Sequence, residues 1–507
     1  MNNGKICVSI CEETVEKLMA ELRRAEEFAD VIEIRLDGLK VEHIGNALDQ
    51  LSSEKSILLT VRPENQGGKI NNNIRGRISL WTSFAMNKNI DHRTVWIDHE
   101  SDLTAWQEWM PWTDDLFVIR SQHHFDGVPD RLDSVYERIV SDTQTGKIAV
   151  HAKEVTDTIG LWNLLERANK AGNRFIPIAM GEAGKWTRIL GLAHGSFMTY
   201  ASLETGRETA PGQVSVEDMI EVFRVKEIDR STAVYGIVAG NTSYSVSPWM
   251  HNAGFKAAGL NSVFVPLQVA DLEAFMKRMV LPETREVDLN FKGFSVTNPH
   301  KRSIIPYLDE VDATAAKIGA VNTVRIEDGK LFGYNTDAPG FIEPLKRAFG
   351  DLTGHRVLVF GAGGAARACI FAMKNEGAVV TVTARNVEKG QTVADEFEVE
   401  YRPPSDEKPA ADDFEIVVNA TPLGTAGNSE QFAVLDSAQM KGLKLVYDLI
   451  YNPVETTLIR EAKAAGVPTI GGLEMLIAQG GKQFEIWTGL PGPAEEMTAA
   501  VRKRLNI

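Results

Sequence analysis

The stretch SQHHFDGVPDRLDSVYERIVSDTQTGKIAVHAK, residues 121–153, places two adjacent histidines at the end of one apolar run and a lysine at the start of the next. Polar and charged groups in buried strands cost free energy unless they are paired or used. His123, His124 and Lys147 are therefore candidates for a base and a nucleophile at the mouth of a fold. The alternative is that they are only solvent-exposed polar side chains at two strand ends.

The two runs belong to a series of eight. The apolar runs cover residues 5–10, 30–37, 56–62, 93–100, 116–122, 147–153, 174–180 and 197–202. Helical patterns such as those at 12–29 and 157–172 separate most of them. Eight strand-like runs at this spacing predict a (β/α)8 TIM barrel. A doubly wound open sheet is the alternative, but it rarely needs eight parallel strands in so short a span.

Length, charge and cysteine usage limit the class of protein. A chain of 507 residues predicts two or three domains. The net charge of −15 argues against a nucleic-acid or anionic-membrane partner, so we expect small-molecule partners only. Cys7, Cys11 and Cys369 have no metal-binding spacing, and we expect no metal and no disulfide. An apolar run starts almost at the N-terminus, and none approaches the roughly 18 residues of a membrane helix, so a cytoplasmic location is expected.

Charged residues gather where the predicted strands end. In a barrel, chemistry takes place at the carboxyl ends of the strands, and residues two apart on a strand point to the same side. Glu33 and Arg35 end the second run, Arg62 ends the third, and Arg188 follows the seventh. Each alone could be a solvated strand end, but together they predict a site for a small polar anion. A partly desolvated lysine among cations is expected to be nucleophilic and to condense with a ketone, while a nearby histidine moves protons.

Six motifs occur in order in this half: EIR (33–35), TVRPENQGG (60–68), SQHHF (121–125), KIAVHA (147–152), MGEAGKWTR (180–188) and TAPGQ (209–213). Together they resemble the type I 3-dehydroquinate dehydratases. The resemblance implies that Lys147 forms an imine with the substrate ketone. It implies His123 as general acid/base, with His124 a bystander. It further implies a set of substrate-holding residues, with Met180 packing nearby: Ser9, Glu33, Arg35, Arg62, Arg188, Thr209 and Gln213.

Two positions depart from that family's pattern. Gln66 stands where the family usually has a glutamate before its Gly-Gly pair. That carboxylate is expected to orient the histidine and stabilise its protonated form, and a neutral amide cannot supply the charge. Either Glu64 substitutes for it, or His123 titrates at a lower pH and turnover is slower. Thr209 replaces the usual serine and keeps a hydroxyl group.

A new series of apolar, strand-like runs begins after a charged stretch at 226–232, which we take as a domain boundary. The sequence VLVFGAGGAARA (357–368) has Gly361, Gly363 and Ala366 in a G-x-G-x-x-A pattern between a strand and a helix. These glycines permit a tight turn and the close approach of a pyrophosphate to the helix N-terminus. The next strand ends in Arg385, where NAD-preferring folds have an acidic residue. A cation there accommodates a 2′-phosphate, so NADP is the predicted cofactor.

Seven further motifs follow in order: SYSVSP (243–248), FSVTNPHK (294–301), GAVNT (319–323), GYNTD (333–337), NATPLG (419–424), VYDLIYNP (446–453) and GGLEMLIAQ (471–479). Over residues 233–507 they resemble the shikimate dehydrogenases. The resemblance implies Lys301 and Asp337 as the catalytic pair, although two such residues could also form a plain salt bridge. It implies these substrate contacts: Ser245, Ser247, Thr297, Asn322, Tyr451 and Gln479. It implies these nucleotide contacts: Gly361, Ala362, Gly363, Gly364, Ala365, Ala384, Arg385, Leu449 and Gly472.

The departures in this half are mild. Tyr244 replaces a common histidine, Ser295 a common asparagine, and Ala384 the asparagine that precedes the nucleotide arginine. The change at Ala384 removes one expected polar contact to the cofactor. It therefore weakens the NADP prediction slightly.

We predict an α/β chain with three parts: a barrel over residues 1–228, a substrate domain over 233–337 plus 484–507, and a Rossmann NADP-binding domain over 338–483. Dehydration of 3-dehydroquinate yields 3-dehydroshikimate, the ketone that a shikimate dehydrogenase reduces. The two resemblances therefore imply one bifunctional enzyme of the shikimate pathway of aromatic amino-acid biosynthesis. One alternative is a catabolic, NAD-dependent quinate/shikimate dehydrogenase. Another is a ligand-sensing regulator, but a sensor needs the pocket and not the four chemical groups that are retained here.

Overall fold

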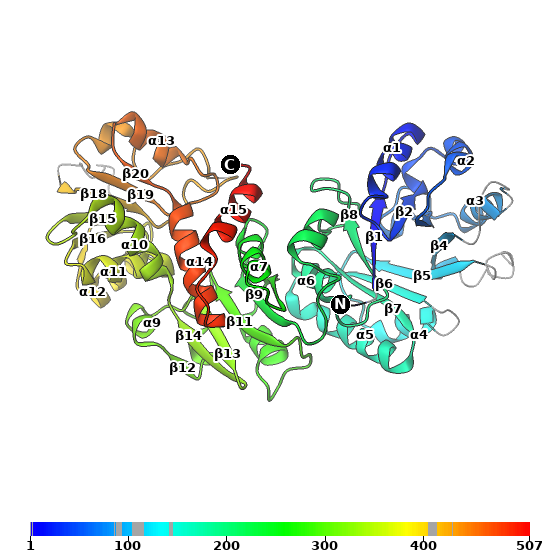
Figure 1. Cartoon of the computed structure of the whole chain (residues 1–507), viewed down its shortest axis with the longest axis horizontal. Coiled ribbons are helices and arrows are strands. Elements are labelled where there is room, and N and C mark those ends of the chain that lie inside the picture. Colours follow the sequence, from blue (N-terminus) through cyan, green and yellow to red (C-terminus); the bar gives the residue numbers. More distant parts are fainter. Residues whose placement is uncertain are drawn as a thin grey trace. The chain divides into compact units, whose positions relative to one another are not determined.

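The computed structural model describes residues 2, 4–85, 87, 94–103, 116–140, 145–403, 413–427 and 429–507. The chain divides into two compact units (Figure 1). The first comprises Met1–Gly236, Asn241–Tyr244 and Asn261–Phe291, and the second comprises Ile237–Gly240, Ser245–Leu260 and Lys292–Ile507. Within the described ranges, no helix has both the length and the apolar character needed to cross a membrane.

All eight predicted strands form in the first unit, and they pair in parallel in sequence order. They are β1 (Lys5–Ile10), β2 (Val31–Arg35), β3 (Ser56–Thr60), β4 (Val95–Glu100), β5 (Phe117–His124), β6 (Thr145–His151), β7 (Arg174–Met180) and β8 (Met198–Ser202). The order β7-β6-β5-β4-β3-β2-β1-β8 leaves β7 and β8 at its two ends. The N–H of Phe197 donates to the carbonyl of Phe175 (3.0 Å), so the sheet nearly closes. The predicted barrel is confirmed over the open doubly wound sheet, whose strand order would not be sequential.

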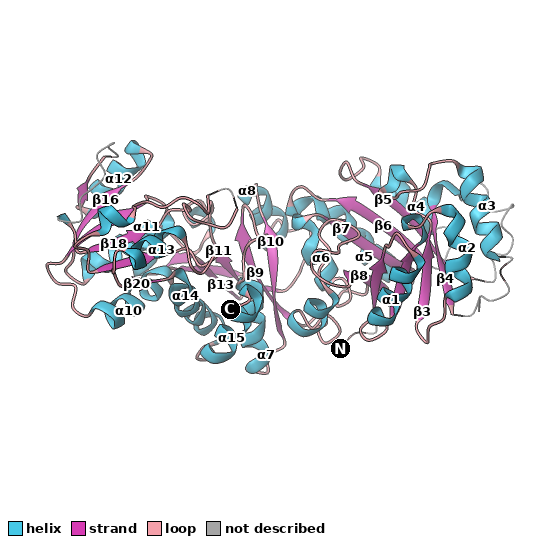
Figure 2. Ribbon diagram, turned by 90° about the horizontal axis from the view of Figure 1, so that it is seen from above, coloured by secondary structure: helices cyan, strands magenta, loops and turns pink. Residues whose placement is uncertain are grey.

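Helices on the outer side of the strands cover the barrel (Figure 2). They are α1 (Val15–Ala25), α2 (Val41–Gln50), α3 (Ile74–Ala85), α4 (Leu132–Val140), α5 (Ile159–Ala171) and α6 (Lys185–Leu190), with short turns η1 (Leu36–Gly38), η2 (Glu64–Gln66), η5 (Val155–Thr158), η6 (Glu182–Gly184) and η7 (Asp218–Val222). In α1 the hydroxyl of Thr14 caps the first turn by accepting from the N–H of Lys17 (3.3 Å). The helix then buries Val15, Leu18 and Leu22, a spacing that keeps one face on the strands.

Alternate residues of the strands fill the barrel. Ten buried residues form this inner cluster: Cys7, Val31, Leu58, Ile119, Ala149, Ile176, Ile178, Met180, Met198 and Tyr200. Because strand side chains alternate, the residues two positions before or after a member of this cluster point to the same interior. That rule places Ser9, Glu33, Ser121 and Lys147 on the inner side with the cluster.

A second sheet of six strands begins directly after the predicted boundary. Its strands are β9 (Ala233–Ala239), β10 (Ser262–Gln268), β11 (Phe291–Val296), β12 (Glu310–Val311), β13 (Thr323–Glu327) and β14 (Lys330–Tyr334), in the order β10-β9-β11-β13-β14-β12. The helical segments of this region are α7 (Ser247–Ala257), α8 (Leu272–Phe275), η8 (Met276–Val280), η9 (Ile305–Tyr307) and α9 (Ala313–Ile318). The turn between β11 and η9 carries Lys301, and the end of β14 leads into Asp337.

The third sheet has the strand order of a dinucleotide-binding fold. Its parallel strands are β15 (Arg356–Phe360), β16 (Val379–Thr383), β17 (Glu400–Tyr401), β18 (Ile416–Asn419), β19 (Leu445–Asp448) and β20 (Thr469–Ile470), ordered β17-β16-β15-β18-β19-β20. The helical elements are α10 (Asp337–Phe349), α11 (Gly364–Asn375), α12 (Val387–Phe397), η11 (Ser437–Met440), α13 (Thr457–Ala464), α14 (Gly472–Thr488) and α15 (Ala494–Leu505). This 3-2-1-4-5-6 order is that of the Rossmann fold. The predicted division at 483/484 lies inside the continuous helix α14.

Candidate active sites

The amine of Lys147 lies inside the barrel between a carboxylate and an aromatic ring. The residue is 4% exposed. Its Nζ lies 3.0 Å from Oδ2 of Asp98, 4.0 Å from Oε1 of Glu33 and 3.9 Å from the centre of the Tyr200 ring. The sequence predicted cations around the lysine, but its nearest charged partners are the carboxylates of Asp98 and Glu33. Asp98 and Tyr200 were not among the predicted site residues.

Arg62 is the hub of a buried charge network. Its guanidinium contacts Oδ2 of Asp98 (2.9 Å), Oε1 of Glu100 (3.1 Å), the hydroxyl of Ser121 (2.8 Å) and Nδ1 of His123 (3.1 Å). Burial alone would raise the pKa of Asp98, but Arg62 and Lys147 hold it well below its usual range. Burial raises the pKa of Glu100 to about 8, against the pull of Arg62. Arg62 therefore organises the site's own side chains.

His123 is held as a neutral base. Burial lowers the pKa of its imidazole well below the usual value, and the cations of Arg62 and Lys147 lower it further. Its backbone N–H donates to Oε1 of Gln66 (3.2 Å). Nδ1 of the imidazole lies 3.1 Å from the guanidinium of Arg62 and 3.4 Å from Oε1 of Gln66, so the tautomer of the neutral ring decides which of the two contacts is a hydrogen bond. A neutral imidazole whose pKa is this low can accept a second proton only against the field of two cations.

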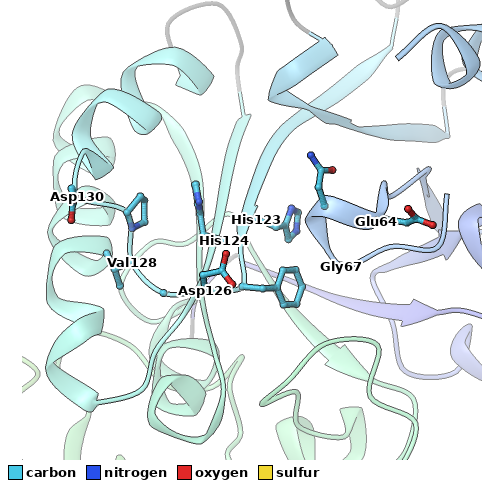
Figure 3. Close-up of a pocket in the computed structure, with 11 residues that line it drawn as sticks. Glu64, Gly67, His123, His124, Asp126, Val128 and Asp130 are labelled. Atoms are coloured by element: carbon cyan, nitrogen blue, oxygen red, sulfur yellow. The ribbon is translucent and has the colours of Figure 1, made fainter. Parts of the chain in front are cut away.

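Figure 3 shows His123 and the loop residues that line the pocket beside it. His123 and His124 project to opposite sides of β5, as consecutive strand residues do (Figure 3). His123 lines a pocket of about 590 Å³ with the loop that carries Gly67. Glu64 is exposed and directed away from His123 (Figure 3), whereas Gln66 is buried and accepts a hydrogen bond from the backbone N–H of His123. Of the two alternatives, Glu64 therefore does not take the place of the usual glutamate.

The remaining substrate residues predicted in the barrel form two groups. The hydroxyls of Ser9 and Thr60 donate to the carboxylate of Glu33. Arg35 is paired in a bidentate manner with the buried Asp37, at 2.8 and 2.7 Å, and Asp37 was not predicted. Ser9, Arg35 and Thr209 line a second pocket of about 330 Å³, which shares Gly67 with the first.

Arg188 is a buried cation without an anionic partner among the residues that the structure describes. It is 1% exposed, and its guanidinium approaches only the carbonyls of Tyr200 and Pro211, each at 3.5 Å. Burial lowers the pKa of the Arg188 guanidinium to about 10. Beside it, Oε1 of Gln213 accepts from the N–H of Thr209 (2.7 Å). An uncompensated cation in such a place is suited to an anionic ligand group.

In the second unit, the predicted catalytic pair is in direct contact. Nζ of Lys301 lies 2.5 Å from Oδ2 of Asp337. The other carboxylate oxygen of Asp337 accepts from Nδ2 of Asn322 (2.8 Å), and Asn322 lies 3.5 Å from Oε1 of Gln479. The four side chains come from the turn after β11, the residue just before β13, the start of α10 and the middle of α14. The structure therefore brings together four residues that the sequence separates by up to 178 positions (479 − 301).

The other substrate residues predicted here have contacts of their own. The N–H of Ser247 donates to the hydroxyl of Ser245 (3.2 Å), and both residues are buried. Thr297 sits in the turn before Lys301, where its carbonyl accepts from the N–H of His300 (2.8 Å). Tyr451 packs against a buried cluster that includes Val246.

Five of the nucleotide residues predicted from the sequence, Gly361 to Ala365, lie at the turn into α11. Gly361 has φ +120°, a conformation that favours glycine. A Cβ on Gly363 would meet no atom of the described residues within 4 Å, so this backbone is open to a ligand. A Cβ on Gly472 would lie 2.2 Å from the carbonyl oxygen of Leu449, so these two residues touch. Arg385 is exposed directly after β16 and its neighbour Ala384, where it can meet a phosphate group.

Known families match the same regions. The model of type I 3-dehydroquinase matches residues 6–230, and that of the shikimate dehydrogenase substrate binding domain matches 237–324. Shikimate/quinate 5-dehydrogenase matches 343–447, and the shikimate 5′-dehydrogenase C-terminal domain matches 472–502. A bifunctional 3-dehydroquinate dehydratase/shikimate dehydrogenase of Arabidopsis thaliana, described as chloroplastic, is 33% identical and covers 97% of this chain and 83% of its own length. The chain belongs to this bifunctional family.

Other members resemble its dehydrogenase half. A shikimate dehydrogenase (NADP+) of Carboxydothermus hydrogenoformans is 38% identical over 54% of this chain and 98% of that protein. A crystal structure of a shikimate dehydrogenase in complex with NADP+ is 38% identical, with a TM-score of 0.51, and covers 55% of this chain and 97% of that one. Membership of the bifunctional family confirms the fold class and the two enzyme activities expected from the motifs. The domain limits, the cytoplasmic location and the roles of single residues stay predictions.

Proposed function

We propose that the barrel dehydrates 3-dehydroquinate to 3-dehydroshikimate through an imine on Lys147, and that the second unit reduces this product to shikimate with NADPH. The observation that carries the first half is the position of the Lys147 amine. It lies buried among Asp98, Glu33 and Tyr200 and is linked through Asp98 and Arg62 to the neutral imidazole of His123. A lysine and a base enclosed in this way are suited to covalent catalysis on a ketone.

His123 acts as the proton carrier of the dehydration. Its lowered pKa keeps the imidazole neutral at physiological pH, so it can accept the proton that leaves the carbon next to the imine. The same imidazolium then donates to the departing hydroxyl, which leaves as water. Arg62 orients the ring through Nδ1, and Gln66 holds its backbone.

Arg188 binds the carboxylate of the substrate. It is the buried cation whose charge no described carboxylate balances, and the pockets at the barrel mouth give access to small polar molecules. Hydroxyl groups of the substrate meet the polar groups of the mouth. Those residues are Ser9, Glu33, Arg35, Thr209 and Gln213, with Arg62 behind them.

Lys301 and Asp337 form the proton-transfer pair of the reductase. NADPH, when bound, supplies the hydride, and the negative charge that grows on the carbonyl oxygen is stabilised by the ammonium of Lys301, which then gives up a proton. Asp337 holds that ammonium, and Asn322 fixes the carboxylate. The substrate is held by Ser245, Ser247, Thr297, Asn322, Tyr451 and Gln479.

The chain offers the features that NADP requires. The open backbone at Gly363 and the positive φ of Gly361 form a cradle that a Cβ would fill, and the free N–H groups of the first turn of α11 favour a pyrophosphate. The pyrophosphate and its neighbours meet Gly361, Ala362, Gly363, Gly364, Ala365, Ala384, Leu449 and Gly472. The exposed guanidinium of Arg385 accepts the 2′-phosphate.

A coupled assay tests the proposal. Purified protein given 3-dehydroquinate and NADPH should form shikimate, with NADPH consumption that follows a lag. Lys147→Ala should abolish shikimate formation from 3-dehydroquinate but not from 3-dehydroshikimate. Lys301→Met should abolish shikimate formation from both substrates while 3-dehydroquinate is still converted to 3-dehydroshikimate. Borohydride with substrate should add a covalent adduct to wild type and to Lys301→Met, but not to Lys147→Ala. A chain that oxidises quinate with NAD+ and does not reduce 3-dehydroshikimate would overturn the reductase proposal.

A further inference from the structure

The ring of Tyr200 presents its face to the amine of Lys147. Nζ lies 3.9 Å from the ring centre, and Asp98 contacts the same nitrogen at 3.0 Å. Both side chains are buried, Tyr200 with 3% and Lys147 with 4% of their surface exposed. A cation over a ring at this distance is attracted by the ring's electron-rich face, and more strongly when water is excluded.

Strand geometry fixes this contact. Tyr200 is the middle residue of β8 and pairs with Cys7 of β1, in the inner cluster of the barrel. Lys147 is the third residue of β6 and pairs with Ile176 of β7, which belongs to the same cluster. Both side chains therefore point into one interior, two strands apart, and neither can leave it without a change of register.

The hydroxyl of Tyr200 has no hydrogen-bond partner among the described residues, although it is buried. Burial also raises the pKa of this phenol well above its usual value, so the ring stays uncharged. A buried hydroxyl without a partner costs free energy and contributes nothing to the fold. The contribution of Tyr200 to the site is therefore its ring face.

We propose that the face of Tyr200 stabilises the cationic nitrogen of the Lys147 imine and so acts directly on the dehydration, an inference that rests on the proposed Schiff-base function. The condensation joins Nζ to the carbonyl carbon of the substrate. The carbonyl oxygen leaves as water with two of the three ammonium hydrogens, and one hydrogen and the positive charge stay on nitrogen. The ring faces that nitrogen before and after the reaction, and Asp98 accepts from the remaining N–H.

Stabilising the iminium matters because it is the electron sink of the next step. When His123 removes the proton from the adjacent carbon, the electron pair moves toward the iminium nitrogen and the charge there decreases. The ring must therefore favour formation and persistence of the iminium rather than substrate binding as such. Its loss should reduce kcat and the fraction of enzyme held as imine, with a small effect on KM.

The test replaces Tyr200 with phenylalanine and with phenylalanines carrying one, two and three ring fluorines, in the full-length protein. Fluorine withdraws electrons from the ring face but keeps its shape. Tyr200→Phe should retain dehydratase kcat within about twofold, and the fluorinated series should lower it stepwise, by about 3- to 30-fold in total. The fraction of protein trapped by borohydride at saturating 3-dehydroquinate should fall in the same order. The reductase activity of the same molecules reports correct folding and should not change.

Tyr200→Leu and Tyr136→Leu form a matched pair. Tyr136 is a second buried tyrosine of the barrel, also 3% exposed and with an unpartnered hydroxyl, but its ring packs against Phe175. Both changes remove a buried ring, and only Tyr200→Leu should lower the trapped fraction. A flat fluorine series, or equal losses in the two leucine variants, would overturn the role of Tyr200. Dehydration that survives Lys147→Ala would instead overturn the Schiff-base function beneath it.

Discussion

The stem of Lys301 lies against Gly364, the first residue of the nucleotide helix α11. A Cβ at Gly364 would come within 2.9 Å of Cδ and 3.2 Å of Cβ of that lysine. The ammonium at the end of the same stem is 2.5 Å from Asp337. The helix start proposed to receive the nucleotide and the lysine proposed to serve the substrate therefore share one contact, so a side chain added at Gly364 should displace Lys301.

Gly364→Ala should lower the kcat of shikimate oxidation by about 10- to 100-fold. The added methyl group pushes the lysine stem away, and the close approach to the near end of the side chain leaves little room for adjustment. A displacement of about 1 Å at a catalytic group costs a factor of this size. Steady-state kinetics with NADP+ and shikimate measures it.

Gly363→Ala is the matched control. Its Cβ would meet no described atom within 4 Å, so the pair of Lys301 and Asp337 should stay in place. The methyl group should instead obstruct the nucleotide and raise KM for NADP+ about tenfold or more, with a small effect on kcat at saturation. The same kinetic profile in both variants would contradict the separation of roles.

Gln66→Glu should move the acid limb of the dehydratase pH profile to higher pH. Oε1 of Gln66 lies 3.4 Å from Nδ1 of His123, whose pKa is now held well below its usual value. A carboxylate at this position favours the imidazolium and should raise that pKa. The neutral base is then lost at a higher pH, so kcat/KM at pH 5 to 6 should fall relative to pH 8.

Glu64→Gln is the control for this change. Glu64 lies two residues away in the same turn, but it is exposed and directed away from the imidazole (Figure 3). Its removal should leave the acid limb where it is. If the acid limb of the pH profile shifts in Glu64→Gln and not in Gln66→Glu, the histidine responds to the exposed carboxylate of Glu64.

Arg188→Met should stabilise the protein while impairing the dehydratase. Burial lowers the pKa of Arg188 to about 10, so at neutral pH the folded state carries an unfavourable charge worth roughly 3 kcal/mol. The methionine removes that cost and keeps much of the volume. Urea unfolding should shift to higher concentration, and KM for 3-dehydroquinate should rise at least about 100-fold because the carboxylate loses its partner.

Arg167→Met serves as the comparison for Arg188. Arg167 is on the barrel surface, where it pairs with Asp133 and Glu137. Surface substitutions of this kind usually change stability by less than about 0.5 kcal/mol. Lower stability of Arg188→Met than of Arg167→Met would show that an anion inside the protein already balances Arg188.

The barrel could be predicted from the sequence because its strands are short apolar runs that end in turns. Its strand order could be predicted as well, because in this fold it follows the chain order. Asp98 and Glu100 were missed, although both are charged residues in a predicted strand. Asp98 and Glu100 stand two apart in the fourth run, just as Glu33 and Arg35 do in the second, so the same argument applied to that run finds them. Which charges pair with which could not be predicted. Arg62 faces Asp98, Glu100 and His123 only because three separate strands converge.

The role of Tyr200 had no signal of its own in the sequence. An aromatic residue within an apolar run is ordinary core material, and nothing in its neighbours indicates that Lys147, two strands away, lies on its face. The contact between Lys301 and Gly364 is equally remote, since it joins a turn of one sheet to a helix of another. The motifs therefore predicted the residues proposed to react, whereas the residues that set their charge could be identified only from the fold.

His251→Gln should make the protein less sensitive to acid. His251 is fully buried, and burial lowers the pKa of its imidazole to about 3, although its bond to Gln483 (3.1 Å) offsets part of this effect. Between pH 6.5 and 3 the unfolded chain binds a proton at this site that the folded chain does not, so stability is complete above pH 6.5 and falls as pH decreases. The loss from this group is about 1.4 kcal/mol per pH unit. Urea unfolding at pH 7, 6 and 5 should show a shallower loss in the variant, whereas replacing the exposed His43 with glutamine should leave the wild-type slope unchanged, and equal slopes in all three proteins would contradict the assignment to His251.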